Sequence, residues 1–85
     1  MMKYVCFKDN EGRESIVTFP DQFVHSDVAN AMMRMHKGFE RSMERYNLHP
    51  VSAGFVGNNS GCYGKSESLR LSSRPEDTEI LRGQR

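Results

Sequence analysis

Several residue types are scarce in this 85-residue sequence, which has no tryptophan, three prolines and only two cysteines. Cys6 and Cys62 lie far apart and form no CxxC pair, so the sequence predicts neither a disulfide framework nor a thiol redox motif. No apolar run approaches the roughly 18 residues of a membrane-spanning helix, and no segment has the pattern of a signal peptide. We therefore expect a cytoplasmic protein with reduced thiols and no membrane contact.

An excess of one charge is also lacking. Twelve lysines and arginines offset 11 acidic residues, giving a net charge of +1. Overall charge therefore favours neither a polyanion-binding protein nor a membrane-surface protein. The length predicts one small domain over residues 1–85 and excludes a multidomain enzyme. Leu, Ile, Val and Phe make up only 17 of the 85 residues, so we expect a small core that gains from dimerisation or a partner.

What the sequence does contain begins with a β-hairpin. The segments 3–8 and 15–19 alternate between two faces and are rich in β-branched and aromatic residues, with Val5 and Phe7 on one face and Tyr4 and Cys6 on the other. Residues 9–12 between them are Asp, Asn, Glu and Gly, which suit a tight turn.

A long amphipathic helix is predicted over residues 27–46. Its apolar positions recur every three or four residues and form one stripe; they are Val28, Met32, Met35, Phe39, Met43 and Tyr46. Ser26 is the expected N-cap, because a serine hydroxyl can accept a hydrogen bond from a first-turn amide. Pro50 follows the helix and cannot continue it.

A second hairpin and a short helix complete the expected fold. Residues 51–56 and 62–71 are predicted strands joined by the loop 57–61, and the second of them, being mostly polar, suits a sheet edge. Ser73 to Glu76 matches the S-x-x-E capping box, which predicts a helix over residues 74–82.

The expected fold class is therefore α+β, with the order β-β-α-β-β. It has an antiparallel sheet, one long helix packed on one face and a short C-terminal helical turn. The other face of the sheet is expected to be partly open, and residues 83–85 are expected to form a frayed tail.

No set of residues predicts catalysis or metal binding. His25, His36 and His49 have no ligand spacing with one another or with the cysteines. A nucleophile such as Cys62 or Ser66 would need one of these histidines, and no flanking pattern predicts such a pair. We expect no enzyme, no cofactor, no metal and no small-molecule substrate.

One segment resembles part of a phosphate-binding loop. Gly64-Lys65-Ser66 matches the end of the motif G-x-x-x-x-G-K-[ST], but Asn59 stands where the first glycine belongs. The segment also lies in a predicted strand instead of opening a helix. We interpret it as part of a plain hairpin.

Two groups of residues are candidate contacts with a macromolecule. For a protein partner, Met33 lies off the apolar stripe of the helix, and the second hairpin offers polar residues on a rigid support; these hairpin candidates are Asn58, Asn59, Ser60, Tyr63, Lys65, Ser66 and Glu67. For a nucleic acid, four cations share one flank of the helix; they are Arg34, Lys37, Arg41 and Arg45. Such a flank is more often simply solvated.

The stretches Cys62-Tyr63-Gly64-Lys65-Ser66-Glu67-Ser68-Leu69 and Ser73-Arg74-Pro75-Glu76-Asp77-Thr78, about a sixth of the chain, resemble small uncharacterised proteins encoded by tailed phages and prophages of Gram-negative bacteria. The resemblance implies an accessory protein that acts in a bacterial host by binding a host or phage macromolecule. It implies no catalytic residue.

These observations favour a non-enzymatic interaction or regulatory module that binds a protein partner or forms a homodimer. The alternative is a nucleic-acid-binding accessory protein that uses the basic flank of the helix.

Overall fold

The computed structural model describes residues 1–39, 48–58 and 61–84, with the side chains of all of these except residues 35–39. The elements are β1 (Met2–Lys8), β2 (Glu14–Pro20), α1 (His25–Phe39), β3 (His49–Gly57), β4 (Gly61–Tyr63), β5 (Lys65–Ser66), β6 (Leu71–Ser72) and α2 (Pro75–Gly83). Four strands form an antiparallel sheet in the order β2-β1-β3-β4, and β5 pairs with β6 in a separate ribbon. The predicted α+β class and the antiparallel sheet are confirmed. No helix of the described residues is long and apolar enough to cross a membrane.

The β1–β2 hairpin confirms the first predicted strand pair. Asp9 fixes its turn, because its carboxylate accepts hydrogen bonds from the backbone amides of Glu11 and Arg13, each at 2.9 Å. Gly12 has a φ of 85°, a conformation that glycine adopts without strain. The turn therefore forms through local contacts that the sequence already encodes.

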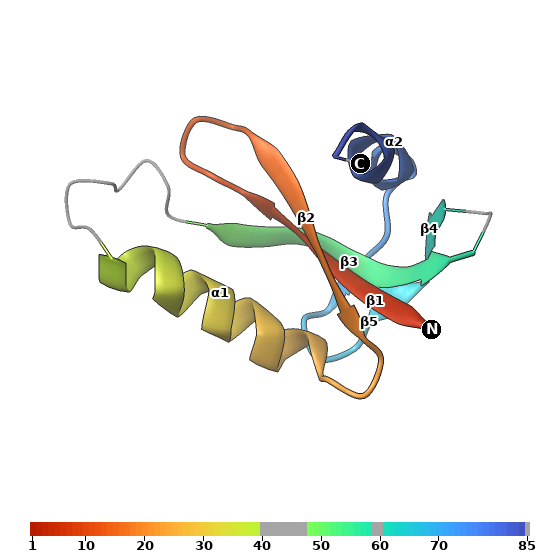
Figure 1. Cartoon of the computed structure of the whole chain (residues 1–85), viewed down its shortest axis with the longest axis horizontal. Coiled ribbons are helices and arrows are strands. Elements are labelled where there is room, and N and C mark those ends of the chain that lie inside the picture. Colours follow the sequence, from red (N-terminus) through yellow and green to blue (C-terminus); the bar gives the residue numbers. More distant parts are fainter. Residues whose placement is uncertain (40–47, 59–60, 85) are drawn as a thin grey trace.

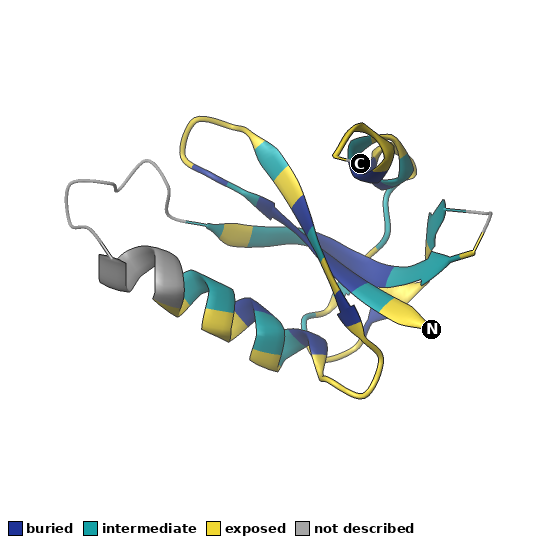
Figure 2. Cartoon of the chain, in the orientation of Figure 1, coloured by how far each residue is buried: buried dark blue, intermediate teal, exposed yellow. Residues whose placement is uncertain are grey.

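Both faces of the sheet are covered, which corrects the expectation of a partly open face. On one face Val5, Phe7 and Ala53 pack beneath α1. On the other face Tyr4 and Cys6 pack against α2. Figure 1 shows the two helices on opposite sides of the sheet, and Figure 2 shows buried residues along the middle of β1.

A β-bulge changes the expected pattern of β3. Cys6 pairs with Ser52, whereas Phe7 pairs with Pro50, so Val51 is an extra residue in β3. Val51 consequently packs against the α2 side of the core, while Ala53 packs on the α1 side. The prediction that Val51 and Ala53 share a face is wrong, because the sequence alternation is interrupted between them.

The first helix begins at His25, so Ser26 lies inside it and is not its N-cap. The described helix has 15 residues, fewer than the predicted segment 27–46, of which residues 40–46 lie outside the described residues. Val28 and Met32 pack against the core as predicted. The orientations of the Met35 and Phe39 side chains lie outside the described part of the chain, as do Met43 and Tyr46.

The predicted strand 62–71 is wrong as a single element. It is divided into β4, β5 and β6, because Gly64 and Arg70 adopt positive φ values of 81° and 56° and turn the chain. Positive φ at a non-glycine residue such as Arg70 is uncommon, so the sequence gives no signal of this second turn.

The C-terminal helix is confirmed within one residue of the predicted 74–82, but its cap differs. Arg74 is the N-cap, and its backbone amide donates to the carboxylate of Asp77 at 3.0 Å. The capping box is therefore formed by Arg74 and Asp77, one residue later than the predicted pair of Ser73 and Glu76.

Both edges of the four-stranded sheet are bonded to α2 or to the residue that follows it. The side chain of Gln84 accepts a hydrogen bond from the backbone amide of Ile16 at 2.6 Å and donates to the carbonyl of Ile16 at 2.9 Å. Thr78 accepts a hydrogen bond from the backbone amide of Cys62 in β4 at 3.0 Å. Gln84 is thus bonded to the sheet instead of belonging to a frayed tail, and Arg85 lies outside the described residues.

Candidate interaction surface

Four side chains form a row across the end of the sheet at which β1 begins. Lys3 in β1 is paired with Phe19 in β2 and with Phe55 in β3, and Phe55 is paired with Tyr63 in β4. Directly paired residues of antiparallel strands project from the same face, with Cβ atoms about 5 Å apart. The row therefore runs from one edge of the sheet to the other, on the face that α1 covers.

The start of α1 covers only part of this row. The buried ring of His25 makes edge-to-face contacts with Phe19 and Phe55, with centroids 5.5 and 5.8 Å apart. Its Nε2 lies 2.9 Å from the carbonyl oxygen of Gly54, which can only accept, so Nε2 carries the proton and donates. His25 is thus a core histidine that joins α1 to β3.

Tyr63 lies beyond the cover that α1 provides. Its ring is tilted by 30° to that of Phe55 with centroids 5.9 Å apart, and the residue is 41% exposed. The uncovered end of the row forms an open groove of about 520 Å³. We call it the Tyr63 groove; its lining includes Lys3, Val24, Phe55, Tyr63, Lys65 and Glu67.

Short polar contacts fix the far wall of the groove. A Cβ at Gly64 would lie 3.0 Å from the ring of Phe55, so the chain passes close to that ring. The buried hydroxyl of Ser66 accepts a hydrogen bond from the amide of Leu69 at 3.2 Å. Ser68 accepts one from the amide of Ser26 at 3.1 Å, which joins the wall to the start of α1.

Two cations and one carboxylate lie at the groove. The amine of Lys3 donates to the backbone carbonyl of Phe23 at 2.9 Å. Lys65 and Glu67 are exposed. In the part of the chain that the structure describes, neither lysine forms an ion pair. The groove therefore offers an apolar floor with a small positive excess along its sides.

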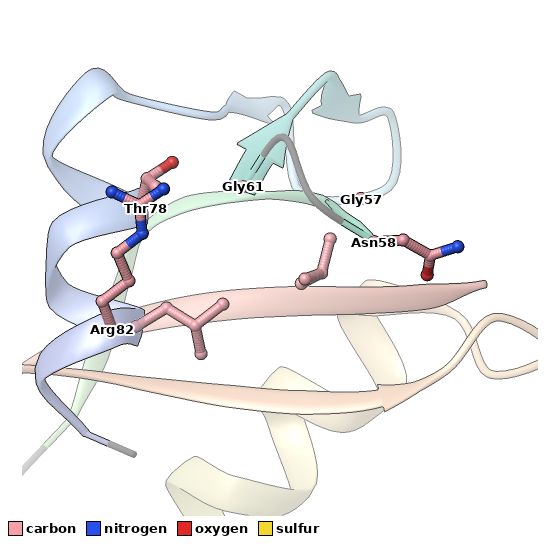
Figure 3. Close-up of a pocket in the computed structure, with 7 residues that line it drawn as sticks. Gly57, Asn58, Gly61, Thr78 and Arg82 are labelled. Carbon is pink, nitrogen blue, oxygen red and sulfur yellow. The ribbon is translucent and has the colours of Figure 1, made fainter.

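A second, smaller hollow of about 200 Å³ lies between the β3–β4 hairpin and α2 (Figure 3). Thr78 and Arg82 contribute from α2, and Gly61 and Asn58 from the hairpin. The guanidinium of Arg82 lies 3.3 Å from the exposed carboxylate of Glu79, so its charge is partly neutralised. This hollow offers neither an exposed aromatic side chain nor a strong charge.

The groove brings together three of the predicted protein-contact residues, Tyr63, Lys65 and Glu67. Asn58 is exposed and shares a neighbouring hollow with Tyr63. The remaining two hairpin candidates of the loop, Asn59 and Ser60, lie outside the described residues.

Two other predicted contacts lie elsewhere. Ser66 is buried at the base of the β5–β6 ribbon, so it supports the groove without lining its surface. Met33 is half-buried and packs against the core on the α1 side, which differs from the expected exposed position.

Of the candidate nucleic-acid contacts, Arg34 is exposed on α1. Lys37 lies in α1, but the structure does not describe its side chain, and Arg41 and Arg45 lie outside the described residues. The basic flank of the helix therefore stays a sequence prediction.

The sequence does not predict a partly buried ionic network beneath α2. The fully buried hydroxyl of Tyr4 donates to the carboxylate of Asp77 at 2.5 Å. The guanidinium of Arg74 donates to Asp77 at 2.8 Å and also bonds to Glu14 in β2. Arg74 three residues before Asp77 in a predicted first turn is the local signal of this network, but the parts played by Tyr4 and Glu14 depend on tertiary contacts.

The network shifts the titration of its members. Burial opposes the charge of Asp77, but hydrogen bonds from Tyr4 and from Arg74 outweigh it and hold the pKa of Asp77 below its ordinary value. The hydrogen bond from Arg74 likewise lowers the pKa of Glu14. Burial raises the pKa of the Cys6 thiol to about 11, which keeps it protonated and unreactive near neutral pH.

The described residues contain no group of three or more His, Cys, Asp or Glu placed to hold a metal ion. Comparisons with protein-family models, with curated proteins and with solved structures found no match to this chain.

Proposed function

We propose that this chain is a non-enzymatic interaction module that binds a protein partner through the Tyr63 groove and the apolar residues around it. The supporting observation is the distribution of exposed large apolar residues, because small monomeric proteins seldom gather such residues in one region without a partner to cover them. Within the described part of the chain they are Met1, Met2, Phe23, Val24 and Tyr63.

All five belong to the same end of the molecule. Met2 begins β1 and is paired with Pro20 at the end of β2, and Phe23 and Val24 follow in the loop to α1. The hydroxyl of Tyr63 donates to the sulfur of Met1 at 3.5 Å. Val24 and Tyr63 line the groove, Phe23 precedes Val24, and Met1 contacts Tyr63. Met2, one residue before Lys3, projects from the opposite face of the sheet at the same end.

The chemistry of the groove favours binding over catalysis. The imidazole of His25 uses Nε2 to bond the carbonyl of Gly54. The hydroxyl of Ser68 accepts the amide of Ser26. Both groups thus hold the fold together, and an aromatic surface beside fixed polar groups is a common form of protein-binding site.

The sheet edges are a less suitable route to a partner. An added strand needs a row of unpaired backbone groups. Gln84 bonds both groups of Ile16 in β2, and Thr78 bonds the amide of Cys62 in β4. We therefore place the contact on side chains at the end of the sheet.

A selection experiment tests the proposal. A library of random peptides displayed on particles is panned against the immobilised protein and, in parallel, against Tyr63→Ser. Glu11→Ser, in the exposed turn between β1 and β2, is the matched control. We expect peptides that bind the wild-type and control proteins and lose binding to Tyr63→Ser. Failure to enrich any peptide, or equal binding to all three proteins, would contradict the proposal.

Sedimentation of the free protein tests the case in which the partner is a second copy. We expect a monomer over a range of concentrations. A dimer that Tyr63→Ser dissociates would instead identify this chain as its own partner.

A further inference from the structure

We propose that the Tyr63 groove recognises a peptide segment that carries a large apolar side chain next to a carboxylate. This inference rests on the proposed function and specifies the chemistry of the partner. Three features support it: the aromatic floor of the groove, the charges along its sides, and the backbone groups beside it that are already hydrogen-bonded.

The floor of the groove fits one large apolar side chain. Phe55 is half-buried and Tyr63 is 41% exposed, and their tilted rings meet at 5.9 Å to form a continuous aromatic surface. Val24, 45% exposed, adds an aliphatic side. A volume of about 520 Å³ is within the usual range of ligand pockets. Burial of an apolar group there would remove these exposed surfaces from water.

The charges of the groove fit a carboxylate beside that side chain. Lys3 lies in the row between Phe19 and Phe55, and its hydrogen bond to the carbonyl of Phe23 orients its amine. Lys65 follows the turn at Gly64. Neither forms an ion pair in the described part of the chain, whereas Glu67 supplies one opposing charge. A single carboxylate complements this small positive excess.

The same charges disfavour a nucleic acid. Nucleic-acid surfaces in proteins are strongly basic, because each phosphate contact needs a cation or a polar donor. Among the described lining residues Glu67 accompanies two lysines, and the exposed Val24 and the preceding Phe23 are apolar. An aromatic surface can stack with bases, so single-stranded DNA is the competing ligand in the test.

The peptide is expected to bind through its side chains instead of adding a strand. Tyr63 is directly paired with Phe55 of β3, and the amide of Cys62 is bonded by Thr78. The carbonyl of Gly64 accepts the amide of Ser73 at 2.9 Å. The backbone next to the groove therefore offers few unpaired groups to an incoming strand.

The test uses the tightest peptide obtained by panning. We expect the selected peptides to share a large apolar residue next to Asp or Glu. Replacement of that acid by its amide should weaken binding about tenfold, and Lys65→Gln should cause a similar loss. Lys65→Arg should retain most of the affinity because it keeps the charge. Arg34→Gln, which removes an exposed cation on α1, should leave the affinity unchanged.

The outcomes separate this inference from the proposed function. Peptides that need Tyr63 but tolerate both the amide and Lys65→Gln would overturn the apolar and acidic specificity and leave the interaction module standing. Failure to obtain any Tyr63-dependent peptide would overturn both. Binding of an oligo-dT strand that depends on Tyr63 and Lys65, without peptide binding, would assign the groove to single-stranded nucleic acid.

Discussion

Asp77 joins α2 to the sheet through a network of hydrogen bonds. It is a fully buried carboxylate that accepts hydrogen bonds from Tyr4 and from Arg74, and Arg74 also bonds to Glu14. Burial of a charge is costly unless it is paired and hydrogen-bonded. Loss of Asp77 would therefore leave Tyr4 and Arg74 without this hydrogen-bond partner.

Replacement of Asp77 by Asn should lower the free energy of unfolding by about 2–4 kcal/mol, because the buried phenol of Tyr4 and the half-buried guanidinium of Arg74 lose their charged partner. Urea unfolding followed by circular dichroism measures this change. Glu79→Gln is the control, because Glu79 forms an exposed ion pair with Arg82 in the same helix, and its loss should cost about 0.5 kcal/mol or less. Equal effects of the two variants would show that the network does not stabilise α2.

The network also predicts how stability depends on pH. The pKa values of Asp77 and Glu14 are lower in the folded protein than in the unfolded chain, so the unfolded chain binds protons first as the pH falls. Their contribution should be complete above about pH 5 and should decline as the pH falls through about 4 and below.

Urea unfolding at a series of pH values checks this dependence. The difference in stability between wild-type protein and Asp77→Asn should be largest near neutral pH and should shrink in acid. A difference that stays constant down to the lowest pH at which the protein folds would argue against an ionised Asp77.

At the scale of elements, α2 covers the face of the sheet opposite α1, and α2 and the residue after it bond one residue in each edge strand. Leu81 packs against the core residues Tyr4, Cys6 and Ile16. Gln84 bonds the edge strand β2, and Thr78 bonds β4. Since unpaired sheet edges promote association, these bonds protect each edge at one residue, Ile16 in β2 and Cys62 in β4.

Replacement of Gln84 by Ala should expose the edge of β2. Two hydrogen bonds to Ile16 would be lost, at a cost of about 1–2 kcal/mol, and exchange of the Ile16 amide hydrogen should become about tenfold faster or more. Hydrogen exchange followed by NMR measures this rate. Gln22→Ala, at an exposed position beyond β2, is the control. Unchanged exchange at Ile16 in Gln84→Ala would mean that the side chain does not protect the edge.

The contact between β4 and α2 requires a glycine. A Cβ at Gly61 would lie 2.5 Å from two side-chain atoms of Thr78, and its φ of 84° is strained for other residues. Gly61→Ala should therefore destabilise the fold by about 1–3 kcal/mol. Gly83→Ala should be neutral or stabilising by up to about 1 kcal/mol, because Gly83 ends α2 with open space around it. Thermal unfolding of the two variants compares them, and a stable Gly61→Ala protein would contradict the close contact.

The sequence predicts elements well where their signals are local. The turn at Asp9 and Gly12 and the helix that starts near Pro75 are specified by residues next to them, and both are confirmed. The division of residues 62–71 could not be predicted, because the turn at Arg70 has no characteristic residue. The bulge at Val51 could not be predicted either, because it depends on how β1 and β3 pair.

At the scale of the whole molecule, two helices cover the two faces of the sheet and leave one end exposed. The start of α1 determines which residues are exposed at this end. The helix begins at His25, whose ring contacts Phe19 and Phe55, and it leaves Tyr63 exposed. The Tyr63 groove is therefore a consequence of how the layers are stacked and not of a single motif.

This origin explains which parts of the site the sequence could predict. The sequence predicts Tyr63, Lys65 and Glu67 as contact residues because they lie on one polar hairpin. Lys3 and Val24 could not be candidates, because register and layer packing bring them to the groove from distant segments. A sequence pattern identifies surface residues that are close along the chain, whereas residues that reach the same surface from distant segments are found only from the tertiary structure.

The most direct test of the central claim is a map of backbone amide shifts as the selected peptide is added to isotopically labelled protein, with a DNA duplex titrated in parallel. We expect the peptide to shift amides around Lys3, Val24, Phe55, Tyr63 and Lys65, and the duplex to cause no comparable change. Shifts along α1 around Arg34 on addition of the duplex, or peptide shifts confined to β2, would contradict the assignment of the Tyr63 groove as the binding surface.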